Sequence, residues 1–333
     1  MNVRMDLTKK KVFLTGADGF IGSHLTEALV KTARAVTAFL HYNSHGYRGM
    51  LEHVPEEVMQ NVNIVWGDLK DGDSVRRAMK SHDAVFHLGA IVSIPYSYVN
   101  PLDVIQTNVL GTSHILEASR ELGIEKIIHT STSETYGTAR VTPISEEHPL
   151  QGQSPYSASK IGADKIAESY FATYNLPVAI LRPFNTYGSR QSARAVIPTI
   201  VTQALTKDSI RLGSLDPTRD LTFVADTVRG FLACAESDAT IGQTINVGTG
   251  KETSIGDLVK LILSLLAMEK PIVADPNRLR PKKSEVMRLI CDPTKAKDLM
   301  QWEPHVSLVD GLAETIPWIR EHLAQYRPET YAI

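Results

Sequence analysis

The sequence predicts an α/β protein with a Rossmann-type, doubly wound parallel sheet and a smaller, discontinuous C-terminal lobe. Three observations support this fold class. Short apolar, β-rich runs alternate with amphipathic helical segments through much of the chain. A glycine-rich turn at residues 16–22 follows the first of these runs and opens a helix. After about Arg182 the regular alternation loosens, and prolines punctuate shorter elements.

The first predicted unit is a strand, a glycine turn and a helix. Residues 11–15 form a short apolar run, and 20–32 follow an amphipathic helical pattern. Gly16 permits the tight turn, Gly19 lets the backbone approach a pyrophosphate, and Gly22 permits close helix packing. The free N–H groups at the start of such a helix bind phosphate. We therefore expect this turn to hold a dinucleotide.

The remaining strands and helices are expected in alternating order. Further strands are predicted at 35–40, 62–66, 84–88, 126–130, 178–181 and 244–247. Further helices are predicted at 102–122, 156–174, 193–207, 226–236, 255–268 and 308–322. We expect residues 1–182 to form the dinucleotide-binding domain, with a re-entry near 220–250, and residues 183–333 to form mainly the substrate-binding lobe.

Composition argues against several classes of protein. The 333 residues are 43% hydrophobic, which is enough for one large α/β unit with a lobe. The net charge of −2 and the absence of a basic block give no electrostatic case for nucleic acid or an anionic membrane. Cys234 and Cys291 lie far apart and match neither a disulfide framework nor a metal motif, which favours a reducing cytoplasm. The sequence predicts no metal site, signal peptide or membrane span.

A tyrosine, a lysine and a glutamate form the candidate catalytic group. Tyr156 and Lys160 are four residues apart, so on a helix they share one face. A nearby ammonium favours the phenolate, and we expect Lys160 to lower the pKa of Tyr156 from its usual value near ~10. The tyrosine would then act as a base near neutral pH. Glu134 precedes this pair, and a carboxylate there indicates chemistry beyond hydride transfer.

A family resemblance rests on six motifs that occur in order along nearly the whole chain. They are the glycine turn, Asp68-Leu69, His87-Leu88-Gly89-Ala90, Asn108 in Asn-Val-Leu-Gly-Thr, Tyr156/Lys160 and Arg182-Pro183-Phe184-Asn185. Together they resemble the extended short-chain dehydrogenases/reductases of the NAD-dependent epimerase/dehydratase family. The resemblance implies a cofactor site made of Gly16, Asp18, Gly19, Phe20, Ile21, Gly22, His41, Asp68, Leu69, Leu88, Ala90, Asn108, Tyr156 and Lys160.

The resemblance also implies roles for these residues. Asp68 and Leu69 would meet the adenine, Ala90 would line the cofactor cleft, and Asn108 would support the catalytic helix. Tyr156 and Lys160 would bind the nicotinamide ribose and act on a sugar hydroxyl.

Within that family, the residue at the position of Glu134 separates several chemistries. Epimerases typically carry a small or hydroxyl residue there, whereas 4,6-dehydratases and UDP-glucuronate decarboxylases carry a glutamate. In a dehydratase, hydride leaves C4 while Tyr156 takes the 4-hydroxyl proton, Glu134 removes the C5 proton, water leaves from C6, and the hydride returns to C6. Thr132 would hydrogen-bond the 4-oxygen. Ser133 stands where many dTDP-glucose 4,6-dehydratases have an acid, so Glu134 would return its proton to the leaving hydroxyl.

The C-terminal half resembles one subgroup, the nucleotide-activated N-acetylglucosamine 4,6-dehydratases of legionaminic-acid-type pathways. The segments that carry this resemblance are 151–156, 184–194 and 280–286. By the resemblance, Arg219 and Arg280 would hold the diphosphate, since the planar guanidinium binds two oxygens at once. Asn185 and Glu285 would contact the phosphate and the nucleotide ribose, and Arg194 is a further substrate-binding candidate.

The end of the second predicted strand leaves the choice of cofactor open. An acid about twenty residues beyond the glycine turn normally binds the adenosine 2′-hydroxyl of NAD. None is present at this strand end, where His41, Asn43, Ser44 and Arg48 would admit a 2′-phosphate. The subgroup resemblance favours NAD, and NADP is not excluded.

The expected function is that of a cytoplasmic 4,6-dehydratase for UDP-N-acetylglucosamine or a GDP-linked equivalent. By resemblance, it would form a homodimer through a four-helix bundle built from the helices near 102–122 and 156–174. Three alternatives stay open. They are a UDP-glucuronate decarboxylase with Arg190 or Arg194 facing the sugar carboxylate, a nucleotide-sugar 4-epimerase, and a cofactor-binding sensor without turnover.

Overall fold

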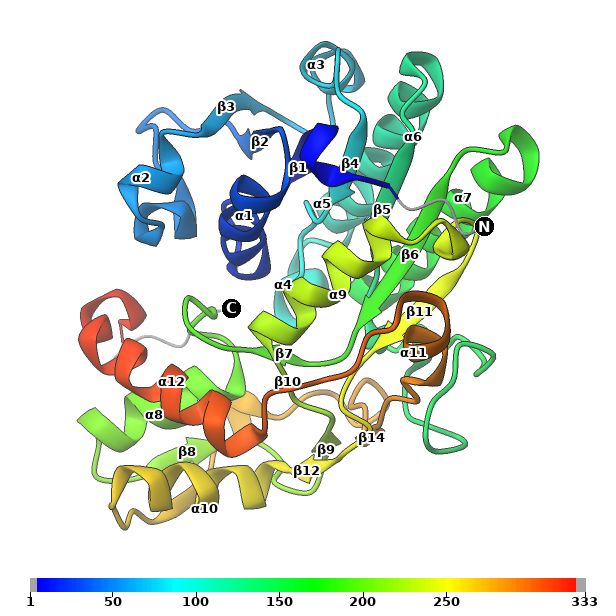
Figure 1. The fold of residues 1–333 in the computed structure, drawn as a ribbon. Coiled ribbons are helices and arrows are strands. Elements are labelled where there is room, and N and C mark those ends of the chain that lie inside the picture. Colours follow the sequence, from blue (N-terminus) through cyan, green and yellow to red (C-terminus); the bar gives the residue numbers. More distant parts are fainter. Residues whose placement is uncertain (1–4, 328–333) are drawn as a thin grey trace.

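A seven-stranded parallel sheet forms the centre of the computed structural model, which describes residues 5–327 (Figure 1). The strand order is β3-β2-β1-β4-β5-β6-β11, and every neighbouring pair is parallel. The order reverses beside β1, which is the hallmark of the doubly wound dinucleotide-binding fold. The predicted fold class is therefore confirmed. The seven strands are β1 (Lys11–Thr15), β2 (Ala35–His41), β3 (Val62–Gly67), β4 (Ala84–His87), β5 (Lys126–Thr130), β6 (Val178–Pro183) and β11 (Thr244–Val247).

Helices cover both faces of this sheet. On one face, α1 (Phe20–Thr32) and α9 (Val224–Glu236) pack against the central strands. On the other face lie α3 (Gly72–Ala78), α6 (Gly111–Leu122) and α7 (Pro155–Tyr174). Covering both faces explains why the strands are continuous apolar runs rather than alternating ones.

The chain returns to this sheet after leaving it. Both α9 and β11 come later in the sequence than residue 183, and β11 pairs with β6 at the sheet edge. The division of the chain at residues 182 and 183 remains a prediction.

Helix α7, which carries Tyr156 and Lys160, has a well-capped N-terminus. The Ser154 hydroxyl accepts from Ser157 N and the Ser157 hydroxyl accepts from Ser154 N, so the two serines form a capping box, with Pro155 at the first helical position. Tyr156, Lys160 and Asp164 follow at intervals of four and lie on the buried face of α7.

One predicted helix is interrupted. The segment 102–122 consists of α5 (Pro101–Ile105), a π-helical turn (Gln106–Leu110) and α6. Asn108 lies in the π-helical turn, and its side chain binds both the N–H and the carbonyl of Ile91. Helical periodicity in the sequence cannot reveal such a turn, because the hydrophobic pattern runs through it unbroken.

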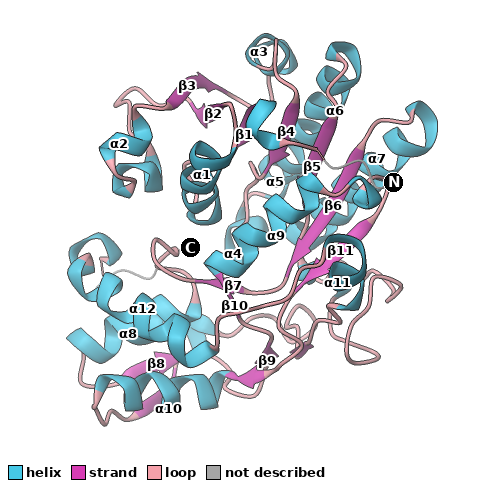
Figure 2. Cartoon of the chain, viewed as in Figure 1, coloured by secondary structure: helices cyan, strands magenta, loops and turns pink. Residues whose placement is uncertain are grey.

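The lobe packs below the sheet as short strands and longer helices (Figure 2). Its helices are α8 (Val196–Thr206), α10 (Ile255–Leu266) and α12 (Leu308–Glu321). The pairs α8 with α10 and α8 with α12 are in contact, and their apolar faces join the same core as α1 and α9. The short strands are β7 (Thr186–Tyr187), β8 (Ile210–Leu212), β9 (Thr218–Arg219), β10 (Thr222–Phe223), β12 (Thr253–Ser254), β13 (Ile272–Ala274) and β14 (Arg288–Leu289). Three short helices lie by the main sheet and its helices, namely α2 (Glu56–Met59), α4 (Ile94–Val99) and α11 (Thr294–Met300).

Two further features concern membranes and metals. Within residues 5–327, the helices are too short or too polar to cross a bilayer. The same residues contain no group of three or more His, Cys, Asp or Glu side chains placed to hold a metal ion.

Candidate active site

A cleft of about 1160 Å³ runs from the glycine turn at the carboxyl edge of the sheet to the lobe. This is where doubly wound proteins bind dinucleotides. Of the site residues predicted from the sequence, two lie behind the cleft wall, namely Asn108 and Lys160. The other residues of the predicted cofactor, catalytic and substrate sites line the cleft: Gly16, Asp18, Gly19, Phe20, Ile21, Gly22, His41, Asp68, Leu69, Leu88, Ala90, Thr132, Ser133, Glu134, Tyr156, Asn185, Arg194, Arg219, Arg280 and Glu285. The alternative candidates Asn43, Ser44, Arg48 and Arg190 do not line it.

The glycine turn fits a pyrophosphate. Gly16 has a φ of +70°, and a Cβ there would lie 2.7 Å from the backbone N of Gly89. A Cβ on Gly22 would lie 2.0 Å from the carbonyl oxygen of Gly16. Gly19 caps α1 without a side-chain hydrogen bond, so the first N–H groups of the helix stay free for an anion.

The carboxyl ends of β2 and β3 form the outer end of the cleft. His41 Nε2 and Asp68 Oδ2 lie 3.7 Å apart, and both side chains are partly exposed. Arg48, a predicted partner for a 2′-phosphate, forms an ion pair with Glu52 at 3.1 Å and does not line the cleft. The side chain of Asn43, another such candidate, binds the backbone of Tyr47.

Asn108 supports the cleft wall from behind. Its Oδ1 accepts from Ile91 N at 2.8 Å, and its Nδ2 donates to Ile91 O and to Ser159 Oγ, each at 3.0 Å. Asn108 therefore ties the loop after β4 to helix α7. Its predicted role as support for the catalytic helix agrees with these contacts, whereas its grouping with the residues that touch the cofactor does not, because the side chain is buried outside the cleft.

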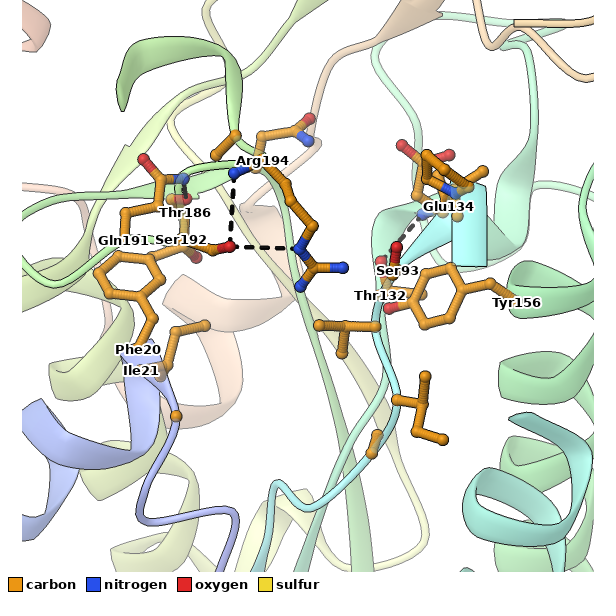
Figure 3. Close-up of a pocket in the computed structure, with 18 of the residues that line it drawn as sticks. Phe20, Ile21, Ser93, Thr132, Glu134, Tyr156, Thr186, Gln191, Ser192 and Arg194 are labelled. Atoms are coloured by element: carbon orange, nitrogen blue, oxygen red, sulfur yellow. Dashed lines mark hydrogen bonds between the residues drawn. The ribbon is translucent and has the colours of Figure 1, made fainter. Parts of the chain in front are cut away.

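Thr132, Glu134 and Tyr156 line the same stretch of the cleft (Figure 3). The 3₁₀ turn Ser133–Tyr136 follows β5, and Thr132 caps it by accepting from Glu134 N at 3.3 Å. Tyr156 comes from the first turn of α7. Thr132 hydrogen-bonds Tyr156, and the charge of Glu134 acts on the same phenol, so this stretch of the cleft offers two groups that can transfer protons.

The pKa of Tyr156 is raised in the structure, whereas the sequence predicted that it would be lowered. Burial raises the pKa of Tyr156, the hydrogen bond with Thr132 opposes this shift, and the charge of Glu134 adds to it. Lys160 is not among the main causes of this shift, and its Nζ donates to the carbonyl oxygen of Thr130 at 2.7 Å. Burial also lowers the pKa of Lys160, to about 8, against the favourable charge of Asp164. The predicted lowering of the Tyr156 pKa is therefore wrong for this geometry.

Asp164 is the centre of a buried polar network that sequence reasoning missed. Its carboxylate accepts from Ser131 Oγ at 2.6 Å and from Arg182 Nη2 at 2.8 Å, and it lies 3.2 Å from His129 Nε2. Although burial raises the pKa of Asp164, the hydrogen bond with His129 and the charge of Arg182 lower it to about 2. The spacing to Lys160, four residues along α7, is the signal that would have found it. The network fixes β5, β6 and α7 behind the catalytic side chains.

The lobe end of the cleft carries two arginines on one carboxylate. Arg219 Nη2 and Arg280 Nη1 each lie 3.5 Å from Glu285 Oε1. Arg280 Nη1 is buried without a well-aligned hydrogen bond, and so is Asn185 Oδ1. Two guanidinium groups against one carboxylate leave a net positive charge facing the cleft, which suits an anionic group.

Arg190 and Arg194 point in different directions. Arg190 is buried outside the cleft, where it pairs with Glu27 and lies 3.4 Å from the His53 carbonyl oxygen. Arg194 lines the cleft and reaches toward Tyr156 (Figure 3). Its Nε donates to Ser192 Oγ at 3.2 Å, and burial lowers its pKa.

Comparison with known proteins shows the family. The model of the family described as GDP-mannose 4,6 dehydratase matches residues 13–315. A UDP-N-acetyl-alpha-D-glucosaminuronate decarboxylase from Bacillus cytotoxicus is 35% identical, over 94% of this chain and 98% of that protein. A dTDP-glucose 4,6-dehydratase from Streptomyces antibioticus is 32% identical, over 95% of this chain and 94% of that protein.

Solved structures agree with the fold. DesIV, a dTDP-glucose 4,6-dehydratase from Streptomyces venezuelae crystallised with NAD and TYD, has a TM-score of 0.86 at 29% identity, covering 96% of this chain and all of that one (100%). Other relatives are named as 4-epimerases. The chain therefore belongs to the GDP-mannose 4,6 dehydratase family of extended short-chain dehydrogenases/reductases, and it is a nucleotide-sugar-modifying enzyme of the NAD-dependent epimerase/dehydratase type.

Proposed function

We propose that the protein is an NAD-dependent nucleotide-sugar 4,6-dehydratase. Its substrate would be UDP-N-acetylglucosamine or a GDP-linked equivalent, and its product the 4-keto-6-deoxy sugar. The observation that carries the proposal is that Glu134, Thr132 and Tyr156 line one stretch of the cleft, where Thr132 hydrogen-bonds Tyr156 and the charge of Glu134 acts on it. A reaction that oxidises C4 and then eliminates across C5 and C6 needs two proton-transfer groups there. NAD is supported by the fit of the glycine turn and by relatives crystallised with it.

The side chains divide the proton transfers between them. NAD supplies a hydride acceptor when it is bound, together with a positive charge that favours the Tyr156 phenolate. Tyr156 takes the proton of the 4-hydroxyl, and Thr132 orients the 4-oxygen by a hydrogen bond. The resulting 4-ketone makes the C5 proton acidic, and Glu134 removes it. Glu134 then returns the proton to the 6-hydroxyl, which leaves as water, since the neighbouring Ser133 is a poor acid. The hydride would return to C6, and C5 would take a proton from solvent, to which Tyr156 gives up the proton that it took from the 4-hydroxyl.

The lobe would hold the nucleotide diphosphate. Arg219 and Arg280 share Glu285 at 3.5 Å, a long ion-pair distance, so both guanidinium groups have donors left for phosphate oxygens. Asn185 has an unpaired buried oxygen at the same end of the cleft. Glu285 would turn to a ribose hydroxyl when the diphosphate takes its place between the arginines.

A UDP-uronate decarboxylase is the second candidate function, and Arg194 favours it. Its guanidinium lines the cleft beside Tyr156, where it would pair with a carboxylate at C6 of the sugar. The relative from Bacillus cytotoxicus is named for that reaction class. A 4-epimerase has less support, because Glu134 would then have no proton to move.

The deciding experiment follows substrate mass. Purified protein is incubated separately with UDP-N-acetylglucosamine, GDP-N-acetylglucosamine, UDP-glucuronate and UDP-N-acetylglucosaminuronate, and the products are measured by mass spectrometry. Loss of one water from an N-acetylglucosamine substrate supports the dehydratase. Loss of carbon dioxide from a uronate moves the assignment to the decarboxylase, and a product of unchanged mass but altered chromatographic position moves it to the epimerase.

We further propose that the protein is a homodimer and that it works in the cytoplasm. Apolar side chains are exposed along α4 to α6, on the side of the molecule where α7 also lies, and these are Val99, Leu102, Ile105 and Leu110. An exposed stripe of this kind suits pairing with a second copy. Cys234 and Cys291 are free, buried thiols, which is compatible with a reducing compartment. Light scattering that finds only monomers at micromolar concentration would refute the dimer.

A further inference from the structure

The adenosine end of the cleft lacks the acid that usually distinguishes NAD from NADP. Strand β2 ends at His41, and the next residues, Tyr42, Asn43 and Ser44, are uncharged. In most dinucleotide-binding folds an aspartate or glutamate at this place accepts from the adenosine 2′-hydroxyl. The selection of cofactor must therefore come from other side chains of this chain.

Asp18 is placed to take over that role. It lies in the turn between β1 and α1, one residue before the helix cap Gly19, and it lines the cleft. Its carbonyl oxygen accepts from Met50 N at 2.8 Å, which anchors the turn to the segment after β2. Burial raises the pKa of its carboxyl, and the nearby His41 opposes this shift. Asp18 thus stands between the pyrophosphate site and the end of β2, where the adenosine ribose belongs.

The charges around Asp18 are unfavourable for a phosphate. Asp68 lies next to His41, and Asp103 also lines this end of the cleft. Lys70 lines this end too, and its ammonium is divided between Asp103 at 3.2 Å and Asp68 at 3.9 Å. Among the described residues, Asp18 forms no ion pair. The carboxylates of Asp18, Asp68 and Asp103 outnumber the ammonium of Lys70, so the adenosine end of the cleft carries a net negative charge.

We propose that Asp18, supported by Asp68, selects NAD over NADP by accepting from the 2′-hydroxyl and repelling a 2′-phosphate. The inference rests on the proposed use of NAD and concerns the binding of cofactor alone. A 2′-phosphate here would meet two carboxylates, and the nearby cationic side chains are engaged: Arg48 pairs with Glu52, and His41 lies 3.7 Å from Asp68. Like charges brought together in this way are strongly disfavoured.

The test is the ratio of NADP to NAD dissociation constants, measured by calorimetry on full-length protein freed of bound nucleotide. We expect the unaltered protein to bind NAD at least about 100-fold more tightly than NADP. Asp18→Asn keeps the shape and a hydrogen-bond acceptor, so it should tighten NADP binding by about tenfold or more and leave NAD within about threefold. Asp68→Asn should change the ratio in the same direction by less, and Asp18→Ser provides a second check should Asn disturb the turn.

Asp73→Asn is the matched control. Asp73 is an exposed acid on α3, 72% accessible and outside the cleft, so its loss should leave the ratio unchanged. A ratio near one in the unaltered protein, or an unchanged ratio in both Asp18 variants, would overturn the inference and leave the dehydratase assignment standing. Binding of neither dinucleotide would overturn both. The experiment measures only the binding of dinucleotides. Its result would therefore be the same if the protein bound NAD but did not dehydrate a sugar.

Discussion

The two ends of the cleft offer an anion different groups. At the dinucleotide end, the turn between β1 and α1 offers backbone N–H groups and has an acidic side chain, Asp18, beside them. At the lobe end, Arg219 and Arg280 face the cleft and share Glu285. Backbone groups select by shape and arginines select by charge. Substitutions of the turn glycines should therefore act through steric fit, whereas substitutions of Asp18 at the same end and of the arginines at the lobe end should act through charge.

Glu134→Gln should give the largest effect, since it removes the proposed base and leaves both binding ends intact. We expect the turnover number to fall by about 1,000-fold, within the range usual for loss of a general base. NAD and nucleotide affinities should change by less than about threefold, as measured by calorimetry. Normal incorporation of solvent deuterium at C5 in this variant would show that another group removes the proton.

Gly22→Ala should disable the dinucleotide end by steric conflict alone. The new Cβ would lie 2.0 Å from the Gly16 carbonyl oxygen, which is a backbone atom and cannot move cheaply. We expect the free energy of unfolding to fall by about 3 kcal/mol or more, together with loss of NAD binding. Gly256→Ala in α10 is the control, because its nearest neighbour would be 3.7 Å away. Equal effects of the two substitutions in denaturant titrations would contradict the steric account.

The burial of Lys160 between the two ends of the cleft predicts that the free energy of unfolding depends on pH. Its pKa is about 8 in the folded protein, against 10.5 for an unperturbed lysine, so the unfolded chain binds more protons between these values. Below pH 8 the folded protein buries a charged lysine, which lowers its stability. As the pH rises above 8 the buried lysine becomes neutral, and this loss of stability disappears. The contribution of Lys160 to stability should thus increase by about 3 kcal/mol from pH 8 to 10.5.

Lys160→Met isolates this contribution. The substitution removes the titrating group. The unfolding free energy of Lys160→Met minus that of the unaltered protein should therefore fall as the pH rises across the same range. A difference that stays constant with pH would mean that the lysine remains fully charged in the folded protein.

Arg280→Met should have the smallest effect and should be confined to the lobe end. It removes one of the two guanidinium groups beside Glu285, and we expect KM to rise by about tenfold with a nearly unchanged turnover number. Added salt should weaken substrate binding to the unaltered protein more than to the variant. Arg278→Met, which alters a neighbouring arginine that also lines the cleft, serves for comparison. An unchanged KM in Arg280→Met would remove Arg280 from the diphosphate site.

The sequence predicted the dinucleotide end better than the lobe. All seven sheet strands were found, because each is a short apolar run and the glycine turn follows the first of them. The π-helical turn at Gln106–Leu110 was missed, since it leaves the hydrophobic pattern intact. The raised pKa of Tyr156 was also missed, because spacing along a helix shows which residues are neighbours but not how deeply they are buried.

The lobe shows why side-chain direction needs the structure. Arg190 and Arg194 are four residues apart and were equal candidates for a sugar carboxylate. The structure separates them, because Arg190 turns away to Glu27 and Arg194 lines the cleft. The Asp164 network was equally hidden, since its partners His129, Ser131 and Arg182 come from two different strands and the loop that follows one of them.

The central claim is that hydride leaves C4 and returns to C6 of the same sugar while Glu134 moves the C5 proton. The most direct test uses the accepted N-acetylglucosamine nucleotide carrying deuterium at C4, with the product analysed by NMR. The account predicts a 4-keto-6-deoxy sugar with that deuterium in its C6 methyl group. A product that keeps deuterium at C4, or one shortened by carbon dioxide when a uronate is supplied instead, would contradict the dehydratase account.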